Sequence, residues 1–274
     1  MITNYLAILL AAGIAAILTG PSAADDRAQT RLCRGTLDFG IISDGVGTLN
    51  QNINTELAGL LEARSGCRIR TISMPVKRVT AELRDGRLHM SGRYFQNEER
   101  DGFLWFAHIQ RTKIFGWFRS DRLSPGEASR FTGSKDLVLG ITAGFSHSPK
   151  VDAIVADWRL RHPMNTVEFP DRKALFEGLL AGRTDLVLLP AATVEELDTV
   201  LNPAKIPLGS FDLTPGEPGA PGGIVFSKKR FDGETAAQWQ RLVTDLCVDG
   251  SILRVFQKYF RATEEDLACR LKMD

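Results

Sequence analysis

Several features are scarce or missing in this sequence, and each absence excludes a class of protein. Basic and acidic residues are almost equal in number, 34 against 33, so no excess of positive charge is available for nucleic acid or a membrane surface. No C-x-x-C spacing occurs, and no histidine lies near a cysteine in the sequence as in a zinc site. We therefore expect no nucleic-acid partner, no metal ion and no cofactor.

Long apolar runs are also missing, except for one at the amino terminus, Tyr5–Leu18. This run is short for a membrane span, which needs about 20 residues, and suits the core of a secretion signal. Small residues follow at 21–24, so we expect residues 1–24 to be a cleaved signal peptide and the mature protein to be soluble and periplasmic. No lysine or arginine precedes the run, which departs from the usual pattern and leaves an uncleaved anchor as the alternative.

Cysteine is sparse, with four residues, all of them after the expected cleavage site: Cys33, Cys67, Cys247 and Cys269. An even count in an exported chain favours disulfides, and four cysteines allow three connectivities. Cys33 and Cys67 each precede one of two predicted neighbouring parallel strands, so both should lie at one sheet edge, where Cα separations of about 5.5 Å are feasible. We predict Cys33–Cys67, and by elimination Cys247–Cys269.

The pattern that is present is a repeated α/β one. Strands are predicted at 36–42 and 68–73, with a helix at 49–64 between them, which makes a right-handed β-α-β unit. A second copy of this plan starts at 137–142, so the pattern indicates two similar lobes. Residues 212–223 contain three prolines and four glycines, which argues against a helix or a central strand there.

Ser91–Ala107 is the stretch with most chemical interest. Its pattern predicts a short strand, an exposed polar loop carrying Arg100, and an apolar segment. A planar guanidinium in such a loop can bind both oxygens of a carboxylate. The alternative is an ordinary surface arginine paired with Glu98 or Glu99.

Five segments resemble motifs of the family 3 extracellular solute-binding proteins, which serve ABC transporters for polar amino acids. Arg100 stands at the family's T-x-x-R arginine, with Asn97 in place of the threonine. Residue 89 is histidine where the family usually has aspartate. The resembling segments are 78–89, 97–106, 138–146, 175–185 and 249–260.

This resemblance implies an α/β fold of the two-lobed periplasmic-binding-protein type, the type II Venus flytrap. Lobe 1 would contain residues 30–116 plus 227–274, and lobe 2 residues 120–222. The two lobes would be joined by two crossing hinge strands, 117–119 and 223–226.

The resemblance also implies a ligand site in the cleft between the lobes. Arg100 would hold a carboxylate, and backbone N–H groups at the start of a lobe 2 helix would bind the same anion. His147 could contact the ligand or lie at the surface. The complete set of expected ligand residues is Ser43, Asp44, Arg93, Tyr94, Phe95, Arg100, Gly144, Phe145, Ser146 and His147.

The implied function is capture of a small carboxylate-bearing solute for the membrane permease of an ABC transporter, by a monomeric, non-enzymatic protein. Pro190 stands where amino-acid binders have the acid that accepts the ligand's ammonium group, so an organic acid is as well supported as an amino acid. One alternative is an enzyme of the cyclohexadienyl dehydratase type, for which Asp44 is the candidate acid. Another is a sensing or interaction module that has lost transport. Residues 144–148 also resemble a nucleophile elbow, but the closing glycine is absent.

Overall fold

The structure is a computed structural model that describes residues 32–43 and 49–269. The expected signal peptide, 1–24, and Asp44 lie outside the described residues. None of the helices within the described ranges has both the length and the apolar character needed to cross a membrane.

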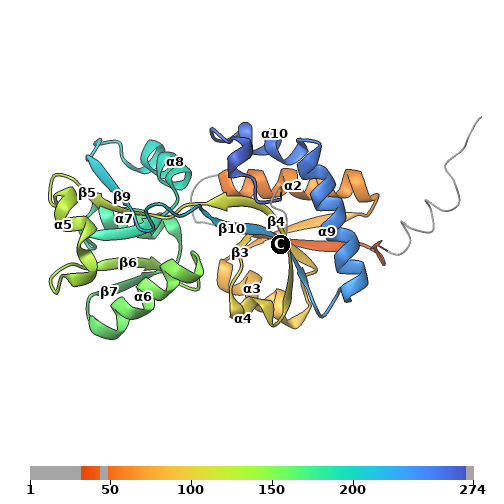
Figure 1. Cartoon of the computed structure of the whole chain (residues 1–274), viewed down its shortest axis with the longest axis horizontal. Coiled ribbons are helices and arrows are strands. Elements are labelled where there is room, and N and C mark those ends of the chain that lie inside the picture. The colour runs from red at the N-terminus through yellow and green to blue at the C-terminus, as the bar shows by residue number, and fades with distance from the viewer. Residues whose placement is uncertain (1–31, 44–48, 270–274) are drawn as a thin grey trace, which may run out of the picture.

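The described residues form two α/β lobes side by side, each built on one five-stranded sheet (Figure 1). In lobe 1 the strand order is β2-β1-β3-β10-β4, and in lobe 2 it is β7-β6-β8-β5-β9. In both sheets the first three strands in this order are parallel, and the fourth is antiparallel to both of its neighbours, so the two lobes share one plan.

The strands of lobe 1 are β1 (Leu37–Ile42), β2 (Ile69–Met74), β3 (Met90–Phe95), β4 (Leu104–Thr112) and β10 (Ala220–Ser227). Its helices are α2 (Leu49–Ser65), α3 (Val76–Asp85), α4 (Glu98–Asp101), α9 (Gly233–Val248) and α10 (Ser251–Gln257). One apolar face of the sheet packs against α2, α9 and α10, and the other face packs against α3.

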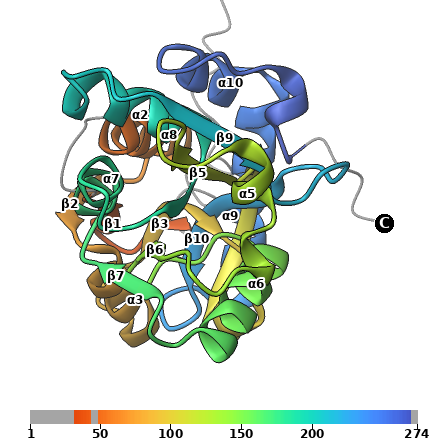
Figure 2. The ribbon, with the colours of Figure 1, turned by 90° about the vertical axis from the view of Figure 1, so that its left-hand side faces the viewer.

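The strands of lobe 2 are β5 (Phe115–Arg119), β6 (Leu139–Thr142), β7 (Thr166–Phe169), β8 (Leu186–Leu189) and β9 (Leu208–Asp212). Its helices are α5 (Pro125–Ser129), α6 (Pro149–Arg161), α7 (Arg172–Leu180) and α8 (Ala191–Leu201). α5 and α6 cover one face, while α7 and α8 cover the other (Figure 2). The sequence pattern did not indicate β9, which lies at the edge of this sheet.

The chain passes between the sheets at residues 113–114, after β4, and again at 213–219, before β10. The residues expected as hinge strands, 117–119 and 223–226, lie within β5 and β10. The boundaries of the two lobes as units stay a prediction.

The expectation that residues 212–223 exclude a central strand is wrong at its carboxyl end. β10 begins at Ala220 and lies between β3 and β4. Proline is tolerated because Pro221 pairs only with β4, and pairing with β3 starts at Gly222. A Cβ at Gly223 would lie 2.1 Å from the carbonyl oxygen of Ala107, so this close strand contact requires glycine.

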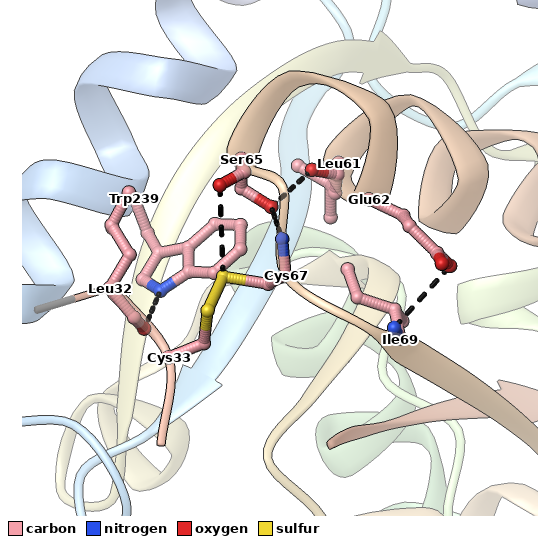
Figure 3. Close-up of a disulfide and its surroundings, with 8 residues drawn as sticks. All are labelled: Leu32, Cys33, Leu61, Glu62, Ser65, Cys67, Ile69 and Trp239. Atoms are coloured by element: carbon pink, nitrogen blue, oxygen red, sulfur yellow. Dashed lines mark hydrogen bonds between the residues drawn. A yellow bond between two sulfur atoms is a disulfide. The ribbon is translucent and has the colours of Figure 1, made fainter. Parts of the chain in front are cut away.

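Both predicted disulfides are present. Cys33–Cys67 joins the segment before β1 to the segment before β2, with Cα atoms 5.8 Å apart (Figure 3). Beside it, the Trp239 indole N–H donates to the carbonyl of Leu32, 3.3 Å away, and ties the same segment to α9. Cys247–Cys269 links the end of α9 to the last described residues, with a Cα separation of 6.3 Å.

Candidate functional site

Arg100 is buried, although the sequence predicted an exposed loop. Asn97 caps the four-residue helix α4 by accepting the Arg100 backbone N–H at 2.9 Å, and this turn directs the guanidinium inward. Arg100 is only 6% exposed, its Nη1 donates to the Phe95 carbonyl at 2.8 Å, and its guanidinium lies 4.9 Å from the Tyr94 ring centre. Burial therefore lowers the pKa of Arg100, against nearby negative charges, including Asp152, that raise it.

Across from Arg100 lies the loop between β6 and α6 of lobe 2. Gly144 takes a left-handed conformation at φ 72°, and Ser148 caps α6 by accepting the Val151 N–H at 3.2 Å. The carboxylate of Asp152, in the first turn of α6, accepts the His147 backbone N–H at 2.9 Å and the Ser146 hydroxyl. The sequence analysis missed Asp152, although an acid in the first turn of a helix after such a loop is a usable indicator.

Hydrogen bonds lower the pKa of Asp152. Burial raises its pKa, but the combined bonds from His147 and Ser146 outweigh burial and hold the pKa of Asp152 below its ordinary value. His147 is itself buried, with Nδ1 3.2 Å from Asp152 Oδ1. The Ser146 hydroxyl donates to Asp152 and not to histidine, so the loop lacks the serine–histidine bond of a nucleophile elbow.

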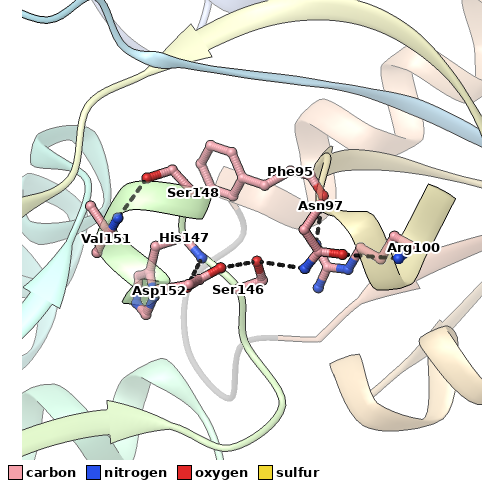
Figure 4. A network of polar contacts seen from close by, with 8 residues as sticks. All are labelled: Phe95, Asn97, Arg100, Ser146, His147, Ser148, Val151 and Asp152. Carbon is pink, nitrogen blue, oxygen red and sulfur yellow. Dashed lines mark hydrogen bonds and ion pairs between the residues drawn. The ribbon is translucent and has the colours of Figure 1, made fainter. Parts of the chain in front are cut away.

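The two lobes touch directly at this point (Figure 4). The Asn97 side-chain N–H donates to Ser146 Oγ at 3.2 Å, and Phe95, which is carried by β3 of lobe 1, packs into the apolar cluster of lobe 2. We call this group, Phe95, Asn97, Arg100, Ser146 and Asp152, the sealed side of the site. Phe95 and Arg100 are buried in it, whereas Asn97, Ser146 and Asp152 are half-buried.

Two of the expected ligand residues, Tyr94 and Phe145, contact other side chains of the protein. The Tyr94 hydroxyl lies 3.3 Å from Thr80 Oγ1, and burial raises the pKa of Tyr94 to about 12. The ring of Phe145 lies 4.4 Å from the guanidinium of Arg172.

A cavity of about 520 Å³ lies between the lobes, and Arg93 is part of its wall. Arg93 has a left-handed backbone, φ 60°, which is rare for a residue other than glycine. Its Nε donates to Gln110 Oε1 and its Nη1 to Asn50 Oδ1, each at 3.1 Å. The lining residues are Arg93, Gln110, Arg111, Thr112, Lys113, Phe115, Pro190, Ala191, Ala192, Thr193, Pro218, Gly219, Phe256, Phe260, Arg261, Glu265 and Asp266.

Pro190 therefore lines this interlobe cavity, as the N-cap residue of α8. Ser43 is half-buried at the end of β1, where its N–H donates to the carbonyl of Met74 at 3.0 Å. Of the nine expected ligand residues that the structure describes, Arg93 lines this cavity, whereas Phe95, Arg100 and Ser146 belong to the sealed side. Within residues 32–43 and 49–269, no group of three or more His, Cys, Asp or Glu side chains is placed to hold a metal ion.

A comparison with protein-family models gives no match, and a comparison with curated protein sequences gives no significant relative. Solved structures do match. An ancestral arginine-binding protein bound to glutamine has a TM-score of 0.66 at 17% identity, over 84% of this chain and 100% of its own.

Two further structures match over similar lengths. The ancestral amino acid-binding protein AncCDT-1, a precursor of cyclohexadienyl dehydratase, gives a TM-score of 0.63 at 16% identity, over 88% of this chain and 100% of its own. The BvgS periplasmic VFT2 domain of Bordetella pertussis gives 0.62 at 16% identity, over 88% and 99%. At these identities the likeness shows the fold, which is that of the type II periplasmic binding proteins.

Proposed function

We propose that this chain, with its type II periplasmic-binding-protein fold, is a periplasmic solute-binding protein that captures a small carboxylate-bearing solute for the permease of an ABC transporter. The ancestral arginine-binding protein and AncCDT-1, both amino-acid binders, have the same fold at low identity, which supports this proposal. Two disulfides within the described residues agree with an oxidising compartment such as the periplasm.

The observation that carries the proposal is the interlobe cavity and its charge. A volume of about 520 Å³ lies in the range of small-molecule sites. Four of its lining residues are cationic, Arg93, Arg111, Lys113 and Arg261, against two acids, Glu265 and Asp266. Lys113 is paired with Asp212. An anion that enters between the lobes contacts both, and therefore favours the closed form.

The direct test is to identify what the protein carries. The full chain is expressed with its own leader and recovered from the periplasm without refolding. Its mass is measured by native mass spectrometry before and after bound solute is released with acid. We expect a released small carboxylate whose binding is then measured by calorimetry. A ligand without an acidic group would contradict the proposal. So would a chain that carries nothing and binds none of the common amino and organic acids.

One observation favours a second candidate, a sensing module. The lobes are joined through Asn97–Ser146, through Lys77–Glu168 at 3.5 Å, and through the Leu49 N–H donating to Glu196 at 2.8 Å. The fold match to the BvgS periplasmic domain is compatible with this candidate. A transporter subunit should change its small-angle scattering profile when it binds ligand. An unchanged, compact profile in both states would favour the sensor.

The dehydratase alternative requires an acid in the cleft that can transfer a proton. Asp152 is present, with hydrogen bonds from His147 and Ser146 that lower its pKa, and Asp44 lies outside the described residues. Incubating the protein with the copurified ligand decides this alternative, because conversion of the ligand would indicate an enzyme.

A further inference from the structure

After α10, lobe 1 continues in a segment, 258–269, whose regular structure is a single 3₁₀ turn and which lies along the interlobe cavity. We infer that this segment, which we call the carboxyl-terminal wall, is part of the ligand site, and that the Cys247–Cys269 disulfide holds it in position. The inference rests on the proposed function and adds to it a positioning role for one of the two disulfides.

The carboxyl-terminal wall supplies side chains to two cavities between the lobes. Its residues in the cavity of about 520 Å³ are Phe260, Arg261, Glu265 and Asp266. A neighbouring cavity is lined by residues 257–262 of lobe 1 and by Ala191, Ala192 and Glu195 of lobe 2. The first turn of α8 lines both cavities, so the carboxyl-terminal wall of lobe 1 and α8 of lobe 2 enclose the same space.

At its amino end, the carboxyl-terminal wall is anchored to lobe 1 by polar bonds. The Lys258 ammonium pairs with the Glu56 carboxylate of α2, and the Tyr259 hydroxyl donates to the other oxygen of the same carboxylate. This anchor lies at the start of the wall, well before Glu265 and Asp266 in the chain.

Beyond Phe260, the noncovalent contacts of the wall are local or small. The 3₁₀ turn Glu264–Asp266 is closed by the Thr263 N–H, which donates to Asp266 Oδ2 at 2.8 Å. The side chains that this part of the wall buries in the core of lobe 1 are Ala262, Leu267 and Ala268. Two of these are alanines, which bury little apolar surface, and a segment with so few buried side chains opens locally at low free energy.

The Cys247–Cys269 disulfide ties the other end of the wall to α9. Cys247 is fully buried, and its Cα lies 6.3 Å from that of Cys269. Cys269 Sγ also lies 3.8 Å from the carbonyl oxygen of Ile109 in β4. A crosslink removes open conformations of the segment that it closes. With both ends fixed, the side chains between them are kept in the lining of the cavity.

Loss of this tether should speed up the release of a bound solute more than it slows capture. A solute enters while the lobes are apart, before α8 and the carboxyl-terminal wall enclose it, so the association rate does not depend on the wall. A wall that opens locally gives the bound solute an exit and admits water, so the dissociation rate rises.

The test compares the two disulfides, which form a matched pair. Each joins one buried and one half-buried cysteine, but Cys33–Cys67 lies before β1 and β2, at the amino ends of those strands (Figure 3). The variants are Cys247→Ala/Cys269→Ala and Cys33→Ala/Cys67→Ala. The probes are the twenty amino acids and a set of small mono- and dicarboxylates, screened by thermal shift on the wild-type chain. The kinetics of the strongest binder are then measured by stopped flow.

We expect both double variants to melt at a lower temperature than wild type, because each loses a crosslink. Removal of Cys247–Cys269 should raise the dissociation rate constant of the probe at least about tenfold and leave the association rate constant within about twofold of wild type. Removal of Cys33–Cys67 should leave both rate constants within about twofold of wild type. A loss of stability alone would change the two variants alike.

Amide hydrogen exchange on the ligand-free protein tests the tether without a probe. Exchange in residues 259–268 should be faster without Cys247–Cys269 and unchanged without Cys33–Cys67. Equal exchange in wild type and Cys247→Ala/Cys269→Ala would overturn the inference, whatever the ligand.

A second pair of variants keeps the test valid if the cysteine variants fold poorly. Leu267→Ala loosens the wall with both disulfides intact, whereas Leu246→Ala removes an equally buried leucine from the same core, in α9. We expect Leu267→Ala to raise the dissociation rate constant about threefold and Leu246→Ala to leave it unchanged.

The outcomes separate the inference from the proposed function. If the probe leaves Cys247→Ala/Cys269→Ala at the wild-type rate, or if both double variants release it faster by the same factor, the inference is overturned and the proposed function stands. If no probe binds the wild-type chain, the proposed function is contradicted and the inference fails with it.

Discussion

The region between the lobes has two sides, and β3 contributes side chains to both. The surroundings of these side chains are opposite. On the sealed side, Phe95 packs into the core of lobe 2, and the buried charge of Arg100 is satisfied by a carbonyl and an aromatic ring. On the cavity side, Arg93 lines about 520 Å³ of open space. Arg93 and Phe95 are only two positions apart in the chain. A β-bulge, where β3 carries one residue more than β10, lies near the carboxyl end of β3, just before the loop that carries Arg100.

This difference bears on Arg100, the carboxylate contact that the resemblance implied. A charged side chain binds solute only where the surrounding groups leave space for it, and Arg100 is buried against Phe95 and Tyr94. That the ligand site lies in this region of the fold stays a prediction. Which residue in that region meets the ligand depends on which side chains fill the gap between the lobes. The predictions below test this contrast.

The largest loss of unfolding free energy is expected from removing a buried side chain of the sealed side. Phe95→Ala removes a buried ring from the contact between the lobes, and a Phe→Ala change in a core costs about 3–5 kcal/mol of unfolding free energy. Urea unfolding of the mature chain measures this loss. Phe115→Ala is the matched control on the cavity side, where the half-buried ring already borders open space. There we expect a cost of about 1 kcal/mol. Equal costs would mean that the two sides are packed alike.

Arg100→Ala should be the next most destabilising change. It leaves the carbonyl of Phe95 without its donor in a buried setting and removes the ring contact, at a cost of about 1–3 kcal/mol. Arg84→Ala is the control, because Arg84 also lies over a ring, that of Phe103, at 4.6 Å, but is exposed. Its loss should be about 0.5 kcal/mol or less. Equal losses of unfolding free energy in Arg100→Ala and Arg84→Ala would contradict the structural role of Arg100.

Much of the fold could be predicted from the sequence because its strands and helices have local patterns. The strand predicted at 36–42 is β1 (Leu37–Ile42), and the helix predicted at 49–64 is α2 (Leu49–Ser65). The pairing Cys33–Cys67 followed from two strands expected to be parallel neighbours, and the structure confirms it. These features depend on periodicity and chain order, which can be determined from the sequence alone.

The misses depend on contacts between distant segments. The start of β10 at Ala220 could not be predicted, because Pro221 is tolerated there only since it pairs with β4 alone. Arg100 was predicted in an exposed loop, since nothing local indicates that Phe95, directly before that loop, packs into the other lobe. The bulge at Arg93 results from register with β10, a strand more than a hundred residues away in the chain.

A smaller effect is expected from the bond that joins the lobes. Asn97→Ala removes both the cap of α4 and the donor to Ser146, and should cost about 0.5–2 kcal/mol. Asn97→Ser keeps a capping oxygen but lacks the reach to Ser146. If the contact between the lobes holds the sealed side closed, both variants should increase the radius of gyration in small-angle scattering. An increase in neither variant would show that Phe95 packing alone keeps this side closed.

The smallest expected effect is the pH dependence due to Asp152. Because hydrogen bonds hold its pKa below the ordinary value, Asp152 contributes stability above its unfolded pKa of about 3.9, and this stability is lost as the pH falls through the lower, folded value. Asp152→Asn should therefore flatten the decline of unfolding free energy with acid below about pH 4. Asp157, on the same helix, also has a lowered pKa, but through an exposed ion pair with Arg161.

The contributions of these two carboxylates to stability should respond differently to salt. The pKa of Asp157 is lowered mainly by Arg161, a charged partner at the surface, so its contribution should shrink at high ionic strength. The donors to Asp152 include the neutral Ser146 hydroxyl and the backbone N–H of His147 on the sealed side, so its contribution should persist. Acid titrations of wild type, Asp152→Asn and Asp157→Asn at low and high salt measure the difference. If salt removes both contributions equally, Asp152 is as open to solvent as Asp157, and this side of the region between the lobes is not sealed in solution.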